Sequence, residues 1–272
     1  SLEHLDRCLS CQACETTCPS GVQYTHLLDI GRALLSSQVK RSVWQQIKRR
    51  SLNYLLPRRT LFHSLYQLGR FFRPLLPGVF KKHIPNSAKI IHWPEIRHQE
   101  RVAIFTGCVQ STLAPQINAA TAQMLDKLSI SSVPTRSNSC CGALSFHLNE
   151  NQAALQWIKR NIDEWWLLLE SGIKNIIFTA SGCGVFIKQY ASLLSDDPDY
   201  AHKAERILAN CMDIAAFLPT RDLSSLRITA NHRIALHAPC SLQHGLGLDT
   251  TLVNMLDTLG FYLTQVRDAH LC

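Results

Sequence analysis

Four cysteines near the start of the chain constrain its fold more than any other feature. They are Cys8, Cys11, Cys14 and Cys18, and Pro19 follows the last of them. The spacing CxxCxxCxxxCP lets a tight loop wrap around one small object, with thiolates converging on it and backbone N–H groups turned inward. A lone CxxC would equally suit a zinc knuckle or a redox pair, but the full run is typical of a loop that holds a [4Fe-4S] cluster. We therefore predict a cluster here, used for electron transfer.

The fourth cysteine of this run predicts a second cluster. In two-cluster ferredoxins the cysteine at this position ligates the other cluster. No second CxxCxxC run occurs downstream, and Ser1 stands only seven residues before the first ligand. We expect Cys8, Cys11 and Cys14 to share one cluster with a fourth ligand upstream, and Cys18 to bind another. The other half of the ferredoxin module is then expected to precede Ser1.

The cysteine content also indicates the compartment. Eleven cysteines occur among 272 residues, and 46% of the chain is hydrophobic. Clustered cysteines in a chain of this size suit metal ligation better than a disulfide framework, which implies a reducing, cytoplasmic location. No uninterrupted apolar stretch approaches the ~20 residues that span a bilayer.

The positive charge is concentrated in one segment. Residues 40–98 hold thirteen Lys or Arg and one acid, Glu95, so the segment carries +12 while the rest of the chain carries −4. Basic pairs alternate there with apolar residues, which predicts two or three amphipathic helices broken at Pro57, Pro74 and Pro77. Three interpretations stay open: peripheral contact with the inner face of the plasma membrane, docking of an acidic partner, and a linker packed on its own core. Nucleic acid is not expected as a partner, because no nucleic-acid module accompanies the charge.

The second half of the chain contains a repeat. Thirty-one residues separate Cys108 from Cys140, and 31 separate Cys240 from Cys272. Each first cysteine follows an apolar strand signal, at residues 102–105 and 234–237, and a similar helix signal lies inside each pair. Two copies of one supersecondary unit predict a pseudo-symmetric α/β body with a site between the copies.

Four cysteines of this half are expected to meet at one edge of a parallel sheet. Cys140 and Cys141 precede Gly142, which permits the irregular turn that adjacent inward thiols require. A long helix is expected over residues 149–170 with Gly172 as its stop, and a strand at 176–178 then leads to Cys183. If the strands are parallel neighbours, Cys108, Cys140, Cys141 and Cys183 converge, to bind zinc or a cluster or to act as redox thiols.

Three further residues receive different interpretations. Cys211 falls within an expected helix over residues 200–217, without a second ligand nearby, and is interpreted as a buried small hydrophobe. His237 and His244 flank Cys240, and an ordinary hydrogen-bonded role is favoured for both over ligation.

At these cysteine motifs the chain resembles the glycolate oxidase (glycolate dehydrogenase) iron-sulfur subunit family. The stretches that carry the resemblance are RCLSCQACETTCPSGVQY, the basic linker with RPLLPG, TASGCG and HAPCSLQHGL, and it covers essentially the whole chain. It implies four regions: half a two-cluster ferredoxin module (1–35), a basic helical linker (36–98), a first cysteine-rich CCG domain (99–225) and the start of a second (226–272). The implied fold is α/β, with a small helical ferredoxin-type module.

The resemblance also implies a function. Flavin-bearing partner subunits, with FAD, would oxidise glycolate to glyoxylate, and this chain would relay the electrons through [4Fe-4S] clusters toward a membrane quinone. No catalytic residue is then expected here. The ferredoxin ligands would be Cys8, Cys11, Cys14 and Cys18, with a further site formed by Cys108, Cys140, Cys141, Cys183, Cys240 and Cys272.

Two departures from the family pattern stand out. Ala180 occupies the first position of the CxxC that closes the first CCG motif, and the chain stops at Cys272, where the resemblance predicts a following Cys-Gly. We therefore expect a fragment clipped at both ends. Related subunits of lactate utilisation, anaerobic glycerol-3-phosphate dehydrogenase and heterodisulfide reductase are alternatives, and a zinc-stabilised interaction module is an alternative of another class.

Overall fold

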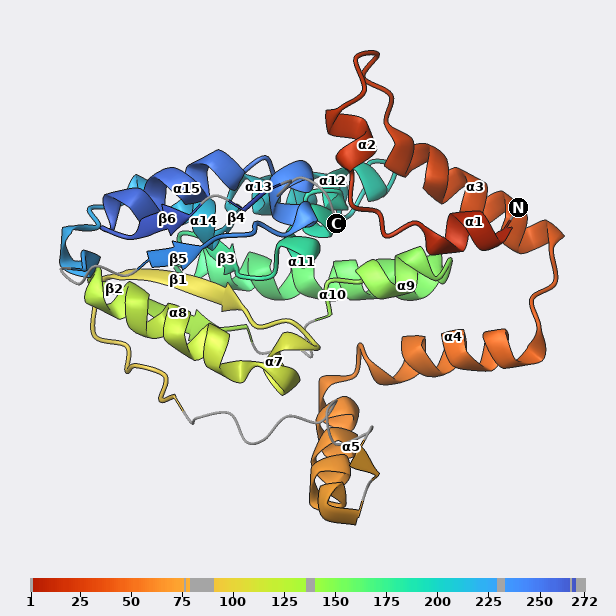
Figure 1. The fold of residues 1–272 in the computed structure, drawn as a ribbon, viewed down its shortest axis with the longest axis horizontal. Helices are drawn as coiled ribbons and strands as arrows, with labels where there is room; N and C mark the ends of the chain where they lie inside the picture. The colour runs from red at the N-terminus through yellow and green to blue at the C-terminus, as the bar shows by residue number, and fades with distance from the viewer. Residues whose placement is uncertain are drawn as a thin grey trace.

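The computed structural model describes residues 2–75, 77–78, 91–135, 140–228, 233–264 and 266–267. Cys272 and part of the basic linker lie outside these residues. The helical N-terminal part, the linker and the α/β body follow one another along the chain (Figure 1). The α/β fold class is therefore confirmed.

The regular elements of the described residues before residue 100 are helices. They are α1 (Leu2–Arg7), α2 (Ala13–Thr16), α3 (Tyr24–Gln38), α4 (Val43–Leu55), α5 (Arg59–Phe71) and the 3-10 turn η1 (Arg73–Leu75). The Ser42 hydroxyl caps α4 by accepting the Gln45 N–H, and Pro57 separates α4 from α5 because proline interrupts a helix. The predicted amphipathic helices and the break at Pro57 are confirmed.

A four-stranded parallel sheet forms the centre of the body. Its strands are β1 (Glu100–Phe105), β2 (Ile130–Pro134), β3 (Ile176–Phe178) and β4 (Cys211–Asp213), in the order β2-β1-β3-β4. The helices of this part are α7 (Gln110–Leu113), α8 (Pro115–Lys127), α9 (Ala143–His147), α10 (Asn151–Glu170), α11 (Ser181–Ile187), α12 (Tyr190–Leu193), α13 (Ala201–Ala209) and α14 (Ile214–Phe217). Two 3-10 turns, η2 (Leu218–Thr220) and η3 (Ser224–Leu226), follow.

Alternating strand residues face two separate cores. Val102 and Ile104 pack with Leu125 of α8 on one face of the sheet. On the other face, Phe105 packs with Trp165 of α10, their ring centroids 5.4 Å apart in an edge-to-face arrangement. Both faces are covered by helices, as expected of a parallel sheet.

The second copy of the repeat adopts the same order of elements as the first. Strand β5 (Arg233–Ala235) leads through the π-helical turn η4 (Ser241–Gly245) and α15 (Asp249–Thr258) to β6 (Tyr262–Thr264), which pairs with β5 in parallel. The first copy runs from β1 through α7 and α8 to β2, also in parallel. Arg101 and Arg233 both lie on the first strand of their copy. The β-α-β repeat is confirmed.

One sequence interpretation is wrong. The expected helix over residues 200–217 is broken, since α13 ends at Ala209 and Cys211 opens β4. This strand pairs with β3, and the backbone N–H of Ile176 donates to the Asn210 carbonyl. Pairing at the sheet edge overrides helix propensity there. Burial raises the pKa of the Cys211 thiol, which agrees with its interpretation as a buried small residue.

Candidate functional site

The four cysteines of the first copy form a continuous row at the carboxyl edge of the sheet. The Cys108 thiol contacts Cys140, Cys140 contacts Cys141, and Cys141 contacts Cys183. Cys108 follows β1 and Cys183 lies in α11, directly after β3, so two neighbouring parallel strands deliver the two ends of the row. All four are thiols rather than halves of disulfides. The predicted convergence of these four cysteines is confirmed.

The turn that carries the two central cysteines depends on Gly142. Its φ of 92° lies in the left-handed region, and a Cβ there would lie 3.2 Å from the Ala154 carbonyl oxygen. The Gly142 N–H donates to the Cys140 sulfur over 3.4 Å. Glycine is therefore required for both the backbone conformation and the space, as the sequence predicts.

Two buried polar side chains hold the backbone of the Cys140-Cys141 pair. The Asn161 amide donates to the Cys140 carbonyl (2.9 Å) and to the Tyr190 hydroxyl (3.1 Å), and that hydroxyl donates to the Cys141 carbonyl (2.7 Å). Both side chains are buried. The sequence analysis missed both side chains. Asn161 could have been found, because it is a polar residue on the same face of α10 as the buried Ile158, Ile162 and Trp165.

A second buried network joins the ends of β1 and β3. The Asn118 amide donates to the Thr106 carbonyl over 3.0 Å, and the Gln110 amide donates to Asn118 Oδ1 (2.7 Å) and to the Thr179 hydroxyl (2.6 Å). Thr106 and Thr179 precede the segments that carry Cys108 and Cys183. These bonds fix both segments relative to the sheet.

Burial keeps the central thiols protonated. For Cys140, contact with Cys108 lowers the pKa, but contact with Cys141 and burial outweigh it and raise the pKa to about 12. For Cys108, contact with Cys140 and then burial raise the pKa well above its ordinary value. For Cys141, contact with Cys140 lowers the pKa, but contact with Cys183 and burial outweigh it and raise the pKa well above its ordinary value. Metal or cluster binding at this row would have to displace these protons.

The N-terminal cysteine loop is fixed by Arg32 of α3. This buried guanidinium donates to the Leu5 carbonyl and to the Cys8 carbonyl, both over 2.8 Å. The backbone at Ser10 and Gln12 has positive φ, and the Ser10 N–H donates to the Cys8 sulfur over 3.4 Å. Amide groups turned toward sulfur are the feature expected of a loop that holds a cluster.

Cys18 lies in a nest of backbone amides. The N–H groups of Val22, Ser20 and Gly21, together with the Tyr24 hydroxyl, outweigh desolvation and lower the pKa of its thiol. Such a site stabilises a thiolate, the form in which cysteine ligates iron or zinc. This environment suits a ligand at Cys18, and the ligand role of the whole cysteine loop stays a prediction. Within the described ranges, no three Cys, His, Asp or Glu side chains are grouped so as to hold one metal ion.

The different environments of the thiols predict different reactivity in the metal-free chain. Since the thiolate is the nucleophile, Cys18 should be alkylated by iodoacetamide at a lower pH than Cys140, whose pKa is raised to about 12. Peptide mass spectrometry after labelling across a pH series measures this order. Chain unfolded in urea is the control, in which the two sites should react alike. Equal labelling in the folded chain would contradict the assignment.

The cysteine loop, α9, α11 and the start of η4 meet at one cleft. A cleft of about 640 Å³ is lined by Cys8 and Cys11 on one side and by Gly182 and Cys240 on the other. The hydroxyls of Ser181 and Ser241 are 2.7 Å apart, so the elements carrying Cys183 and Cys240 are adjacent. A site between the two copies stays a prediction.

His244 connects the second copy to the cysteine loop. Its Nδ1 is hydrogen-bonded to the Thr16 hydroxyl (2.8 Å), which agrees with the hydrogen-bonded role favoured for it. A Cβ on the neighbouring Gly245 would lie 2.9 Å from Gln12 Oε1 and 2.4 Å from Val185 Cγ2. Any larger residue here would require the Gln12 and Val185 side chains to shift, so glycine favours this close approach.

Comparisons with known proteins agree with this geometry. The parallel sheet and its thiol row define an α/β cysteine-rich domain, and residues 102–188 match the model of the CCG family, described as "Cysteine-rich domain". The chain is 44% identical over 271 residues to the glycolate oxidase iron-sulfur subunit of Escherichia coli K12, covering 99% of this chain and 67% of that protein. The chain belongs to the family of glycolate oxidase iron-sulfur subunits.

Two further relatives are less similar to this chain. The probable glycolate oxidase iron-sulfur subunit of Bacillus subtilis 168 is 28% identical over 248 residues, which cover 82% of this chain and 55% of that protein. Lactate utilization protein A of an Exiguobacterium species is 21% identical over 173 residues, 63% of this chain and 69% of that protein. The lactate-related alternative therefore has weaker support than the glycolate oxidase family.

Proposed function

We propose that this chain is the electron-transfer subunit of a glycolate oxidase, an oxidoreductase complex. Cys8, Cys11 and Cys14 are proposed to ligate one [4Fe-4S] cluster and Cys18 a second, and the cysteine row with Cys240 and Cys272 forms the second redox site. When bound, a [4Fe-4S] cluster accepts and passes on single electrons. The chain holds the thiolates, orients amides toward them and keeps the two cysteine sets close. Family membership and the amide environment of Cys18 support this.

The observation that carries the proposal is the cleft between the two cysteine sets. Cys8, Cys11, Gly182 and Cys240 all line it, although these segments are far apart in sequence. An arrangement in which the ferredoxin-type loop shares a cleft with Cys240 suits electron transfer between the two proposed redox sites. A purely structural zinc site would not need this proximity.

The proposed partners follow from the family. Flavin-bearing subunits, with FAD, are proposed to oxidise glycolate and deliver electrons to this chain in a reducing, cytoplasmic compartment. No helix in the described part of the chain is long and apolar enough to cross a membrane. We propose that the basic linker contacts a membrane peripherally, toward which the electrons are passed. Exposed Trp44 and Phe71 on α4 and α5 support this contact, since each is at least 75% exposed.

The first test is the iron, zinc and acid-labile sulfide content of anaerobically purified protein. Iron with matching sulfide and a reducible EPR signal would support the relay, whereas zinc without sulfide would favour the interaction module. Dye reduction by the chain together with its flavoprotein partner then identifies the substrate. We expect glycolate to support reduction faster than L-lactate or glycerol-3-phosphate, and the opposite order would reject the glycolate assignment.

A further inference from the structure

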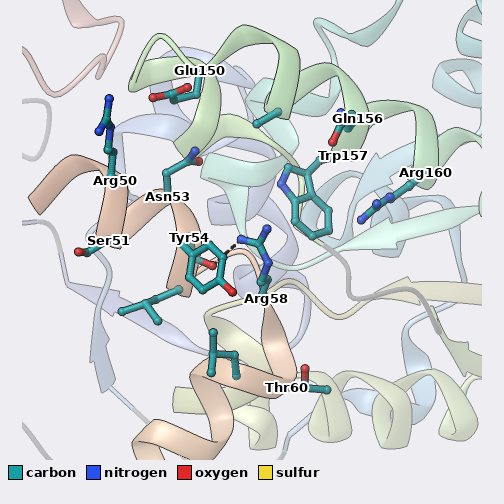
Figure 2. A pocket seen from close by; sticks show the side chains of 13 residues that line it. Arg50, Ser51, Asn53, Tyr54, Arg58, Thr60, Glu150, Gln156, Trp157 and Arg160 are labelled. Carbon is teal, nitrogen blue, oxygen red and sulfur yellow. Dashed lines mark hydrogen bonds between the residues drawn. The ribbon is translucent and has the colours of Figure 1, made fainter. Parts of the chain in front are cut away.

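A large cleft lies away from the cysteines, between the basic linker and α10. It has a volume of about 870 Å³. Its lining includes Arg50 and Tyr54 of α4, Arg58 before α5, and Trp157 and Arg160 of α10. Figure 2 shows Arg58 and Trp157 pointing into the cleft from opposite walls. The cleft therefore collects cationic and aromatic groups from segments distant in sequence.

Two of its guanidinium groups are held in place without a counter-charge. Arg58 donates to the Tyr54 carbonyl over 2.7 Å and lies 4.1 Å from the centroid of the Tyr54 ring. Arg160 lies 5.1 Å from the centroid of the Trp157 ring. Within the described residues, neither of these groups nor Arg50 is ion-paired with a carboxylate.

Within the described part of the chain, two other arginines of the linker are ion-paired, unlike the three arginines of the cleft. Arg41 and Arg49 both pair with Asp6. The cleft contains three arginines and one carboxylate, Glu150, so it carries a net charge of +2. Guanidinium groups bind the oxygens of phosphate through paired N–H donors, and fixed ones lose less entropy on binding. The chemistry of the cleft therefore suits a phosphate group.

Exposed apolar faces of both linker helices run into the cleft. On α5, Leu61 lines the cleft, and Leu65, Leu68 and Phe72 follow on the same helix face at spacings of four, three and four residues. These three are 44%, 53% and 44% exposed. On α4, Trp44 (77% exposed) and Ile47 (48%) share a face with Tyr54, which lines the cleft. A phosphate at the cleft would thus lie near exposed apolar side chains of both linker helices.

We propose that this cleft binds the phosphate of an acidic phospholipid, with the apolar faces of α4 and α5 against the acyl region. This inference rests on the proposed membrane contact and deepens it, because it assigns the headgroup to Arg50, Arg58 and Arg160. An acidic protein segment would satisfy the arginines but not the exposed leucine and phenylalanine side chains. The combination of fixed guanidiniums and an adjoining apolar stripe favours the lipid.

The test is cosedimentation with vesicles of equimolar phosphatidylcholine and phosphatidylglycerol, at constant ionic strength. R58Q/R160Q should bind about 25-fold more weakly than the unaltered chain, from about fivefold for each basic residue at the surface. The matched control K127Q/K174Q removes the same charge from exposed positions on other elements and should change binding less than threefold. An equal loss in both variants would overturn the cleft assignment.

The contribution of the exposed apolar side chains is tested with a second variant and its control. L65S/L68S should weaken binding, whereas Leu167→Ser, at a 70% exposed position on α10, should not. Unchanged vesicle binding of L65S/L68S would overturn the proposed contact between the apolar face of α5 and the acyl region. Circular dichroism of each variant confirms folding, which exposed substitutions should preserve.

Two further results would overturn the lipid assignment. Binding of inorganic phosphate without vesicles, lost in R58Q/R160Q while vesicle binding is unchanged, would indicate a soluble phosphate compound. Loss of flavoprotein binding in R58Q/R160Q, again with unchanged vesicle binding, would indicate an acidic protein partner. Vesicle binding needs no cluster, so iron and sulfide content tests the electron-transfer proposal separately.

Discussion

Replacing Gly184 with alanine should destabilise the protein by about 3 kcal/mol, at the upper end of ordinary overpacking costs. A Cβ at Gly184 would lie 2.1, 2.7 and 2.8 Å from three carbons of the Phe178 ring. That ring is 1% exposed and belongs to the same buried core as Trp165, so it has little room to move. Thermal unfolding followed by circular dichroism should show a melting temperature about 10 °C lower.

Gly182 is the matched control, two residues earlier in the same helix. No atom lies within 4 Å of a Cβ built there. Gly182→Ala should therefore be neutral or stabilising by up to about 1 kcal/mol, because alanine restricts the unfolded chain. Equal destabilisation by both substitutions would show that helix flexibility, rather than contact with Phe178, requires glycine at residue 184.

Replacing Cys11 with alanine should abolish electron transfer from the flavoprotein partner, with a loss of at least about 100-fold expected for a ligand that must hold the cluster. The protein should also lose iron and sulfide and the brown colour of the cluster. Cys11 lines the same cleft as Cys240, so its loss should remove the cluster that the N-terminal run is proposed to hold there. Iron analysis, EPR and dye reduction measure the three effects.

Cys211→Ala is the control for this substitution. Cys211 lies in β4, outside the cysteine row, and its thiol has a pKa raised by burial alone. Its removal should cost about 1 kcal/mol of stability while iron content and electron transfer are retained. Unchanged iron in Cys11→Ala, or an equal loss in Cys211→Ala, would reject the ligand assignment for the N-terminal run.

Local patterns predicted most elements of the α/β body. The strands at residues 102–105 and 176–178 follow from short apolar runs, and the helix at 149–170 from its periodicity, although it begins at Asn151. Gly172 has a φ of 88° and ends that helix. Cys211 is where local reasoning failed, because a three-residue edge strand depends on its neighbour in the sheet rather than on its own sequence.

The sequence by itself determined the cysteine loop, the β-α-β repeat and the residues that form the thiol row, because spacing and periodicity are local properties of the chain. Only the tertiary structure decided which buried groups support them. Asn161, Tyr190 and Arg32 hold cysteine backbones from distant helices, and the Thr16–His244 hydrogen bond joins segments 228 residues apart. Such contacts depend on how the elements pack, and nothing in the local pattern specifies their partners.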